Sequence, residues 1–236
     1  MTAPAPEPVT TLLVIAKQPV PGRVKTRLVP PCTHEQAAAL AEAALADTLH
    51  TAAAAPARRR VLVLDGEPGP WLPPGFDIVP QCGGPLDERL ANAFAGADGP
   101  TLLIGMDTPQ VTRDLLTVDW QGADAVFGPA ADGGFWALGL RVPDPALLRG
   151  VPMSTASTGA IQRARLLAAG LRVADLPQLR DVDTAADAVA VALQAPGGRF
   201  AARARELAAV LSPAGRGGPA VTEEDVIAKN ALGATA

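Results

Sequence analysis

Short apolar runs alternate with longer helical segments along most of the chain. Runs of about four to eight aliphatic residues that end in turn-forming residues are typical of buried strands. They fall at 10–16, 61–65, 76–80, 101–105, 123–130, 135–140 and 171–176. Helices are expected from a capping-box pattern at Thr33–Gln36 to about Ala55, over 86–97, around 156–169 and from about 184 to 194. This alternation predicts an α/β fold with a mostly parallel sheet and helices on both faces.

The ends of the chain depart from this pattern. Residues 1–9 are rich in proline and alanine, and we expect them to be disordered. The main domain is predicted over 10–195. Residues 196–236 form a C-terminal extension, in which 199–211 is expected to be a helix, 212–220 a linker and 221–236 a weak helical tail.

Composition excludes several classes of protein. The formal net charge of −4 argues against a general nucleic-acid binder. The two cysteines, Cys32 and Cys82, lie far apart, which argues against a cysteine-rich zinc site or a disulfide scaffold. No stretch approaches the roughly 18–20 apolar residues of a membrane span, and the N-terminus lacks the basic start of a signal peptide. We therefore expect a cytoplasmic protein with no membrane span.

A basic loop, AKQPVPGRVKTRL (16–28), follows the first predicted strand. Its cations are Lys17, Arg23, Lys25 and Arg27. No acidic residue lies between Glu7 and Glu35, so these cations repel one another unless an anion neutralises them. Gly22 would let the backbone approach a phosphate closely. The segment matches neither the Walker A nor the G-x-G-x-x-G pattern. It predicts a phosphate site, with a solvated surface loop as the alternative.

Four carboxylates fall on loops that follow or join strands: Asp107, Asp132, Asp181 and Asp183. In open α/β sheets such loops gather at the ligand-binding edge. Hard cations such as Mg²⁺ or Mn²⁺ prefer oxygen ligands and would bridge a nucleotide diphosphate. The alternatives are a turn or helix cap for Asp107 and a cap beside Thr184 for Asp183. The only two histidines lie in the first predicted helix, so a histidine metal site or a Ser-His-Asp triad is poorly supported.

The loop GPAADGGFW (128–136) is more specific. Its Gly133-Gly134 pair permits a tight turn in which Asp132 can face a ligand. An Asp-Gly hairpin turn between two strands is the competing interpretation, and the two are compatible.

Together these segments resemble the radical-SAM/selenodomain-associated family of GT-A-fold transferases, which is placed among the nucleotide-diphospho-sugar transferases. The resemblance covers about residues 10–195. It rests on AKQPVPGRVKTRL, QCGGPLDERLANAF (81–94), GMDTPQ (105–110), GPAADGGFWALGL (128–140) and LPQLRDVDT (176–184). Met106 and Met153-Ser154-Thr155 depart from the pattern of the family on the acceptor side.

The resemblance implies a role for each matching residue. The four cations of the basic loop, with Gly22, would bind the nucleotide phosphates, and Gln81 with Gly83 and Gly84 would lie against the base. Asp107 and Asp183 would hold Mg²⁺ or Mn²⁺. Asp132, flanked by Gly133 and Gly134, would bind or deprotonate the acceptor. Asp132 and Lys25 are the candidate catalytic residues.

Three functions remain open at this point. The leading hypothesis is transfer of a sugar from a nucleoside diphosphate sugar to a small acceptor. The second is nucleotidyl transfer from a nucleoside triphosphate with release of pyrophosphate, as in phosphoguanylyl and molybdopterin nucleotidyltransferases. The third is nucleotide binding without catalysis. The sequence does not indicate the oligomeric state.

Overall fold

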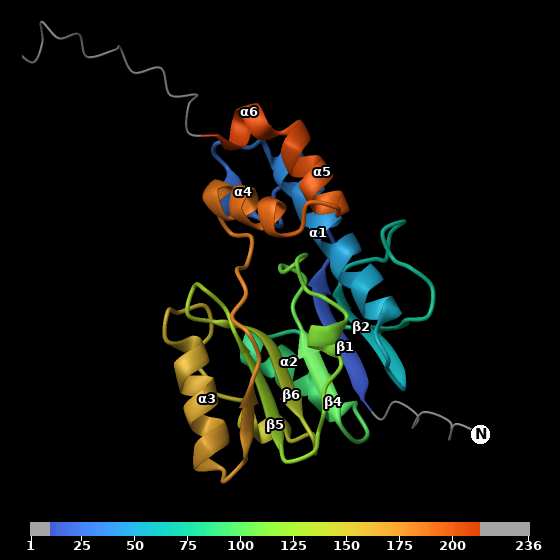
Figure 1. Ribbon diagram of the computed structural model, residues 1–236, viewed down its shortest axis with the longest axis vertical. Helices are drawn as coiled ribbons and strands as arrows, with labels where there is room; N and C mark the ends of the chain where they lie inside the picture. Colours follow the sequence, from blue (N-terminus) through green and yellow to red (C-terminus); the bar gives the residue numbers. More distant parts are fainter. Residues whose placement is uncertain (1–9, 213–236) are drawn as a thin grey trace, which may run out of the picture.

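The computed structural model describes residues 10–212, so the tail expected at 1–9 and the segments expected beyond 212 lie outside the described residues. A seven-stranded sheet forms the centre, in the order β3-β2-β1-β4-β6-β5-β7 (Figure 1). The strands are β1 (Thr11–Lys17), β2 (Arg59–Asp65), β3 (Asp77–Pro80), β4 (Thr101–Ile104), β5 (Ala125–Pro129), β6 (Phe135–Leu140) and β7 (Val173–Asp175). Each one falls within or beside a run predicted as a strand.

All pairings in the sheet are parallel except those of β6, which runs antiparallel to both β4 and β5. The carboxyl ends of β1, β4, β5 and β7 therefore meet the start of β6 at one edge. The predicted mostly parallel α/β sheet is confirmed.

Helices cover both faces of the sheet, as predicted. They are α1 (His34–Ala54), α2 (Leu86–Ala95), α3 (Thr158–Ala168), α4 (Ala185–Gln194), α5 (Arg199–Glu206) and α6 (Ala208–Leu211). Because side chains alternate along a strand, Leu12 and Val14 of β1 face α1, whereas Leu13 packs in a cluster with Phe94 of α2 and Leu166 of α3. Short 3₁₀ turns lie at Thr26–Leu28, Asp114–Leu116 and Pro145–Leu147.

Helix α1 belongs to two cores. It begins with the expected capping box, in which the Thr33 hydroxyl accepts from the Gln36 amide and the Gln36 side chain accepts from the Thr33 amide. Its Ala41, Leu45 and Leu49 pack on the sheet. Its Leu40 and Ala44 pack instead in a third cluster with α4, α5 and α6.

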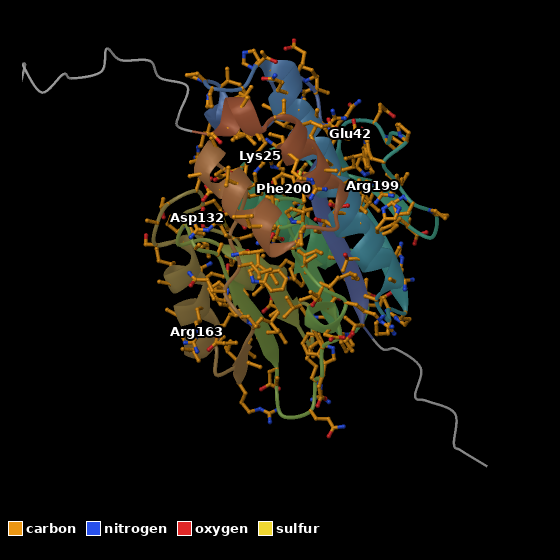
Figure 2. The ribbon with its side chains drawn as sticks, turned by 45° about the horizontal axis from the view of Figure 1, so that its top comes forward. Lys25, Glu42, Asp132, Arg163, Arg199 and Phe200 are labelled. Carbon is orange, nitrogen blue, oxygen red and sulfur yellow. The ribbon has the colours of Figure 1, made fainter. Side chains whose placement is uncertain are left out.

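These last three helices lie together at one end of the molecule (Figure 1). Phe200, at the start of α5, is 1% exposed within the third cluster and lies close to α1 (Figure 2). Residues 199–211, expected to be one helix, thus form two short helices that share this core. No helix in residues 10–212 is long and apolar enough to span a membrane.

Candidate functional site

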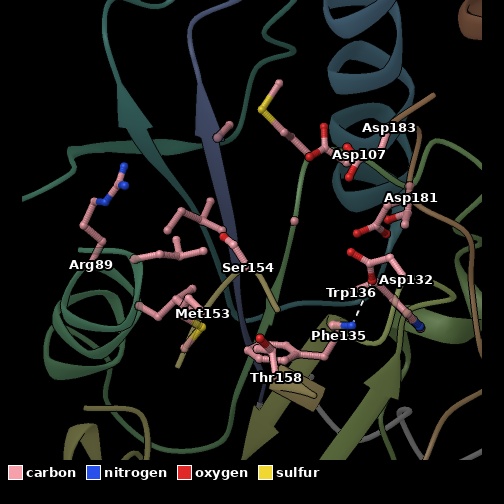
Figure 3. Close-up of a pocket in the computed structure, with 18 of the residues that line it drawn as sticks. Arg89, Asp107, Asp132, Phe135, Trp136, Met153, Ser154, Thr158, Asp181 and Asp183 are labelled. Atoms are coloured by element: carbon pink, nitrogen blue, oxygen red, sulfur yellow. Dashed lines mark hydrogen bonds between the residues drawn. The ribbon is translucent and has the colours of Figure 1, made fainter. Parts of the chain in front are cut away.

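A cavity of about 460 Å³ opens at the edge where the strands end. It is lined by side chains from the ends of β1 and β4, from the start of β6 and from helix α2. The loops around residues 132, 154 and 182 complete its wall. Figure 3 shows its carboxylates on one side and Arg89 of α2 on the other. The walls between them are largely apolar, with Leu86, Phe135, Trp136 and Met153 among the lining residues. The cavity therefore has carboxylates at one end and Arg89 at the other, with apolar walls between them.

All four candidate carboxylates line this cavity. Asp107 follows β4, Asp132 lies in the β5–β6 turn, and Asp181 and Asp183 lie between β7 and α4. The Val182 amide donates to the Asp107 carbonyl at 3.1 Å, which ties the last segment to the end of β4. The Val182 side chain is buried. Because side chains alternate along an extended chain, those of Asp181 and Asp183 point away from that core, and both line the cavity. Thr184, not Asp183, caps α4, which leaves the Asp183 carboxylate for the site.

Lys25 lies between two of these carboxylates. Its Nζ is 2.8 Å from Asp107 Oδ1 in an ion pair, and it donates a hydrogen bond to Asp183 Oδ1 at 3.1 Å. Arg27 Nη1 donates to Asp183 Oδ2 at 2.9 Å. The Lys25 side chain is only 7% exposed. Burial lowers the pKa of Lys25, but the two carboxylates raise it by more, so the pKa stays above its usual value and the ammonium is charged.

The basic loop therefore has acidic partners, which were not expected because no acidic residue lies near the loop in the sequence. The carboxylates that neutralise Lys25 and Arg27 come from segments about 80 and 160 residues further along the chain. Lys17 and Arg23 form no ion pair with residues 10–212. Together with Lys25 and Arg27 they line a second cavity of about 240 Å³, which shares Asp107 and Asp183 with the first. Two cations thus remain available to an anion beside the carboxylate pair.

Asp181 is a lining residue whose role the sequence did not reveal. Its Oδ1 is buried without a hydrogen-bond partner among the described residues. Burial, followed by the charges of Asp107 and Asp132, raises the pKa of Asp181 to about 7. Thr108, 1% exposed, also lines the cavity, and its hydroxyl has no hydrogen-bond partner within residues 10–212. Asp181 was already among the candidate carboxylates. Its spacing of two residues from Asp183, around the apolar Val182, is the signal that could have indicated that both side chains face the same cavity.

The loop after β5 is both a turn and a wall of the cavity. Asp132 Oδ1 accepts a hydrogen bond from the Gly134 amide at 2.8 Å, drawn dashed in Figure 3. The Gly133 carbonyl accepts from the Gly159 amide at 2.8 Å, which fastens the turn to the start of α3. Gly134 lines the cavity, whereas Gly133 is not among the lining residues. The two interpretations of this loop thus describe the same structure.

Gly133→Ala is expected to destabilise the protein by more than about 2 kcal/mol. Gly133 has φ +91°, which costs an L-residue roughly 1–2 kcal/mol. An added Cβ would also lie 2.1 Å from the Ala156 carbonyl oxygen, a backbone atom that cannot swing away. Gly150→Ala is the matched control, because Gly150 has φ +74° with open space around the added Cβ. Denaturant unfolding should show a clearly larger loss for Gly133→Ala; equal losses would contradict the predicted collision.

Gln81 lies in the cavity wall, but its amide is already engaged. Its Nε2 donates to the carbonyls of Ala16 and Val63, at 2.6 and 3.1 Å, and its Oε1 accepts from Arg89 Nη1 at 3.2 Å. It therefore positions Arg89, for which the sequence left open a ligand contact from the helix start or an exposed surface position; the structure places Arg89 in the cavity wall. Gly83, Gly84 and Gly22 are exposed and do not line either cavity.

The donor set fits one kind of metal site. Within residues 10–212, no three His, Cys, Asp or Glu side chains are arranged to hold a metal ion by themselves. Mg²⁺ is commonly held by one or two carboxylates together with substrate phosphates. Asp107 and Asp183, bridged by Lys25 and bordering the basic cavity, match that arrangement and not a preformed metal cage.

Comparison with known proteins identifies a family and related folds. The profile of a family described as "Uncharacterized protein conserved in bacteria (DUF2064)" matches residues 34–155. No curated protein matches the sequence. A crystal structure from Desulfovibrio desulfuricans G20, provisionally described as a nucleotide-diphospho-sugar transferase, is similar over 86% of this chain and 96% of its own, with 28% identity and a TM-score of 0.76.

Two further structures share the fold at lower identity. Rv0371c from Mycobacterium tuberculosis H37Rv is 22% identical, with a TM-score of 0.50 over 79% of this chain and 98% of its own. CMP:2-keto-3-deoxy-manno-octonic acid synthetase complexed with CTP is 12% identical, with a TM-score of 0.51 over 80% and 99%. The fold is thus one shared by nucleotide-sugar transferases and nucleotidyltransferases.

Proposed function

The chain belongs to the DUF2064 family, and from the geometry of its site we propose that it is a metal-dependent glycosyltransferase. It would move a sugar from a nucleoside diphosphate sugar to a small acceptor. The similarity to the Desulfovibrio protein described as a nucleotide-diphospho-sugar transferase supports the donor class. The radical-SAM/selenodomain-associated group remains our proposal for its place within the family.

One observation carries the proposal. The Asp107–Asp183 pair, the available cations Lys17 and Arg23, and the carboxylate of Asp132 border connected cavities at one edge of the sheet. A diphosphate fits between the cations and the carboxylate pair. Asp132 then faces the same cavity from the β5–β6 turn, where an acceptor would approach. The apolar walls can bury the remainder of the donor.

In the proposed reaction the bond between the sugar C1 and the diphosphate oxygen breaks. A bond forms between C1 and the acceptor oxygen, the nucleoside diphosphate leaves, and the acceptor proton passes to Asp132. Lys17 and Arg23 offset the charge that develops on the leaving diphosphate. A divalent cation held by Asp107 and Asp183 would supply further charge neutralisation at the same oxygens.

The test is thermal unfolding with nucleotide sugars, nucleoside diphosphates and nucleoside triphosphates, each with and without Mn²⁺. A ligand at about a hundred times its dissociation constant adds about 2.7 kcal/mol, a shift of several degrees for a chain of this size. A shift that needs both Mn²⁺ and a nucleotide sugar is expected. Absence of any shift would contradict the proposed site, and binding without turnover of any donor would favour a non-catalytic role.

Nucleotidyl transfer is the second candidate, because the basic cavity gives it specific support. Four cations and two carboxylates line that cavity, which leaves it net positive, and pyrophosphate carries more negative charge than the diphosphate of a nucleotide sugar. There an acceptor would attack the α-phosphate of a nucleoside triphosphate and pyrophosphate would leave. Release of pyrophosphate instead of a nucleoside diphosphate from a turning-over donor would establish this reaction in place of sugar transfer.

Asp132→Asn is expected to lower kcat by about 10²–10⁴, because an amide cannot accept the acceptor proton. The amide oxygen can keep the hydrogen bond from Gly134, so the turn should hold its shape. Donor binding, measured by the thermal shift with Mn²⁺, should stay within about twofold. A kcat that falls less than tenfold would remove Asp132 from the reaction.

A further inference from the structure

Lys25 occupies the place that a metal ion would need. Its Nζ is 2.8 and 3.1 Å from the two carboxylate oxygens that face each other, Asp107 Oδ1 and Asp183 Oδ1. A Mg²⁺ ion bound to the same oxygens would lie about 2.0–2.1 Å from each. The ammonium and the metal therefore cannot both bind between these oxygens, and Lys25 must leave before a metal can bind there.

The charges lead to the same conclusion. The two carboxylates of Asp107 and Asp183 are balanced by the two cations Lys25 and Arg27. Asp132 and Asp181 also line the cavity, but both Oδ1 atoms of the pair are engaged by Lys25, and Asp183 Oδ2 is engaged by Arg27. A free divalent ion at these oxygens would have to displace an ammonium whose side chain is only 7% exposed, and a buried cation that loses its carboxylate partners is unfavourable.

A nucleotide phosphate changes this balance. Lys25 also lines the basic cavity, beside Lys17 and Arg23, so a phosphate bound there offers its ammonium a new partner. The exchange involves a short movement of one side chain on a loop. A metal ion would then meet the two Oδ1 atoms that Lys25 has left, together with phosphate oxygens, which is the donor set that Mg²⁺ commonly uses.

We propose that Lys25 excludes free metal from the Asp107–Asp183 pair, so that the site takes the donor as a metal–nucleotide complex. This rests on the metal site of the proposed function. Lys25 is then a displaceable internal cation that couples the two ligands. Because such coupling is reciprocal, nucleotide tightens metal binding by the same factor by which metal tightens nucleotide binding.

The test measures Mn²⁺ binding to the metal-free protein by electron paramagnetic resonance of free Mn²⁺, without nucleotide. In Lys25→Met the affinity for Mn²⁺ alone should rise by about tenfold or more, since coupling free energies typically correspond to factors of about 5–150. The affinity of the same variant for a nucleoside diphosphate with Mn²⁺ should fall. The nucleotide is whichever of UDP, GDP, ADP and CDP gives the largest thermal shift.

Lys17→Met is the matched control. It removes the same charge from the same cavity without an ion pair to Asp107 or Asp183. It should weaken the nucleotide complex and leave the affinity for Mn²⁺ alone within about twofold. An equal gain in Mn²⁺ affinity in both variants would show that the gain comes from losing any positive charge near the site, and it would overturn the proposal. No gain in Lys25→Met would also overturn it.

Lys25→Gln serves if Lys25→Met does not fold, because it keeps a hydrogen-bond donor without the charge. A measurement on the wild-type protein tests the coupling independently. Its affinity for Mn²⁺ should rise about tenfold or more when the nucleoside diphosphate is saturating. Equal Mn²⁺ affinity with and without nucleotide would overturn the proposal. If no nucleotide binds at all, the proposed function fails, while the Mn²⁺ comparison between wild type and Lys25→Met still decides the role of Lys25.

Discussion

Asp107→Asn is expected to abolish metal-dependent nucleotide binding. Asp107 supplies one of the two carboxylates that meet at Lys25, and asparagine at this position keeps the size of the side chain but loses its charge. With one carboxylate removed, a divalent ion loses one of the two protein ligands proposed for it, and Asp183 alone faces Lys25 and Arg27. We expect the affinity for nucleotide with Mn²⁺ to fall about a hundredfold or more, which corresponds to about 2.7 kcal/mol.

The measurement is the Mn²⁺-dependent thermal shift with the preferred nucleotide, which should disappear in Asp107→Asn. Glu42→Gln is the control, because Glu42 is an exposed carboxylate on α1, away from both cavities. It should keep the full shift. An Asp107→Asn protein that binds the metal–nucleotide complex as the wild type does would show that Asp107 is a turn residue and not a ligand.

Phe200→Ala is expected to destabilise the folded state by about 3–5 kcal/mol, although Phe200 lies beyond the segments that resemble transferases. The ring is 1% exposed and packs in the cluster that joins α1, α4 and α5. Loss of the ring would leave a cavity between α1 and the two short helices α4 and α5. For a chain of this size the melting temperature should fall by roughly 6–20 °C.

Leu193→Ala, on the exposed face of α4, provides the comparison for Phe200→Ala. Leu193 is 76% exposed, so its truncation should change stability by less than about 0.5 kcal/mol. If both variants melt alike, then α5 contributes little and the proposed boundary at residue 195 separates a dispensable extension. A large loss in Phe200→Ala alone would place residues 199–211 within the folded unit.

The helices and strands could be predicted from the sequence because each is determined by residues that are close together in the chain. The capping box of α1 requires only Thr33 and Gln36, and the buried strands are short aliphatic runs that end in turn residues. The order of the strands has no such local cause. That β6 lies between β4 and β5 depends on which hydrophobic faces pack together, and the sequence does not encode this at any one position.

The site was predictable only in part, for a related reason. Strand ends indicated where Asp107, Asp132 and Asp183 would gather, because parallel strands share a carboxyl edge. The partners of these residues come from distant segments. The pairing of Lys25 with Asp183 spans 158 positions, and the hydrogen bonds that occupy the amide of Gln81 come from β1 and β2. Polar side chains that look available in sequence are thus often already satisfied in space.

The antiparallel placement of β6 has a consequence for how the protein could diversify. It brings the β5–β6 turn, and with it Asp132, to the edge where β1 and β4 end. In the proposed reaction the acceptor end thus depends on one short turn, whereas the donor end is assembled from β1, β4 and the segment before α4. Turns tolerate sequence change better than strands. Exchange of residues 130–131, with Asp132, Gly133 and Gly134 kept, should therefore change acceptor choice while leaving donor choice unchanged, which makes this turn a target for directed evolution.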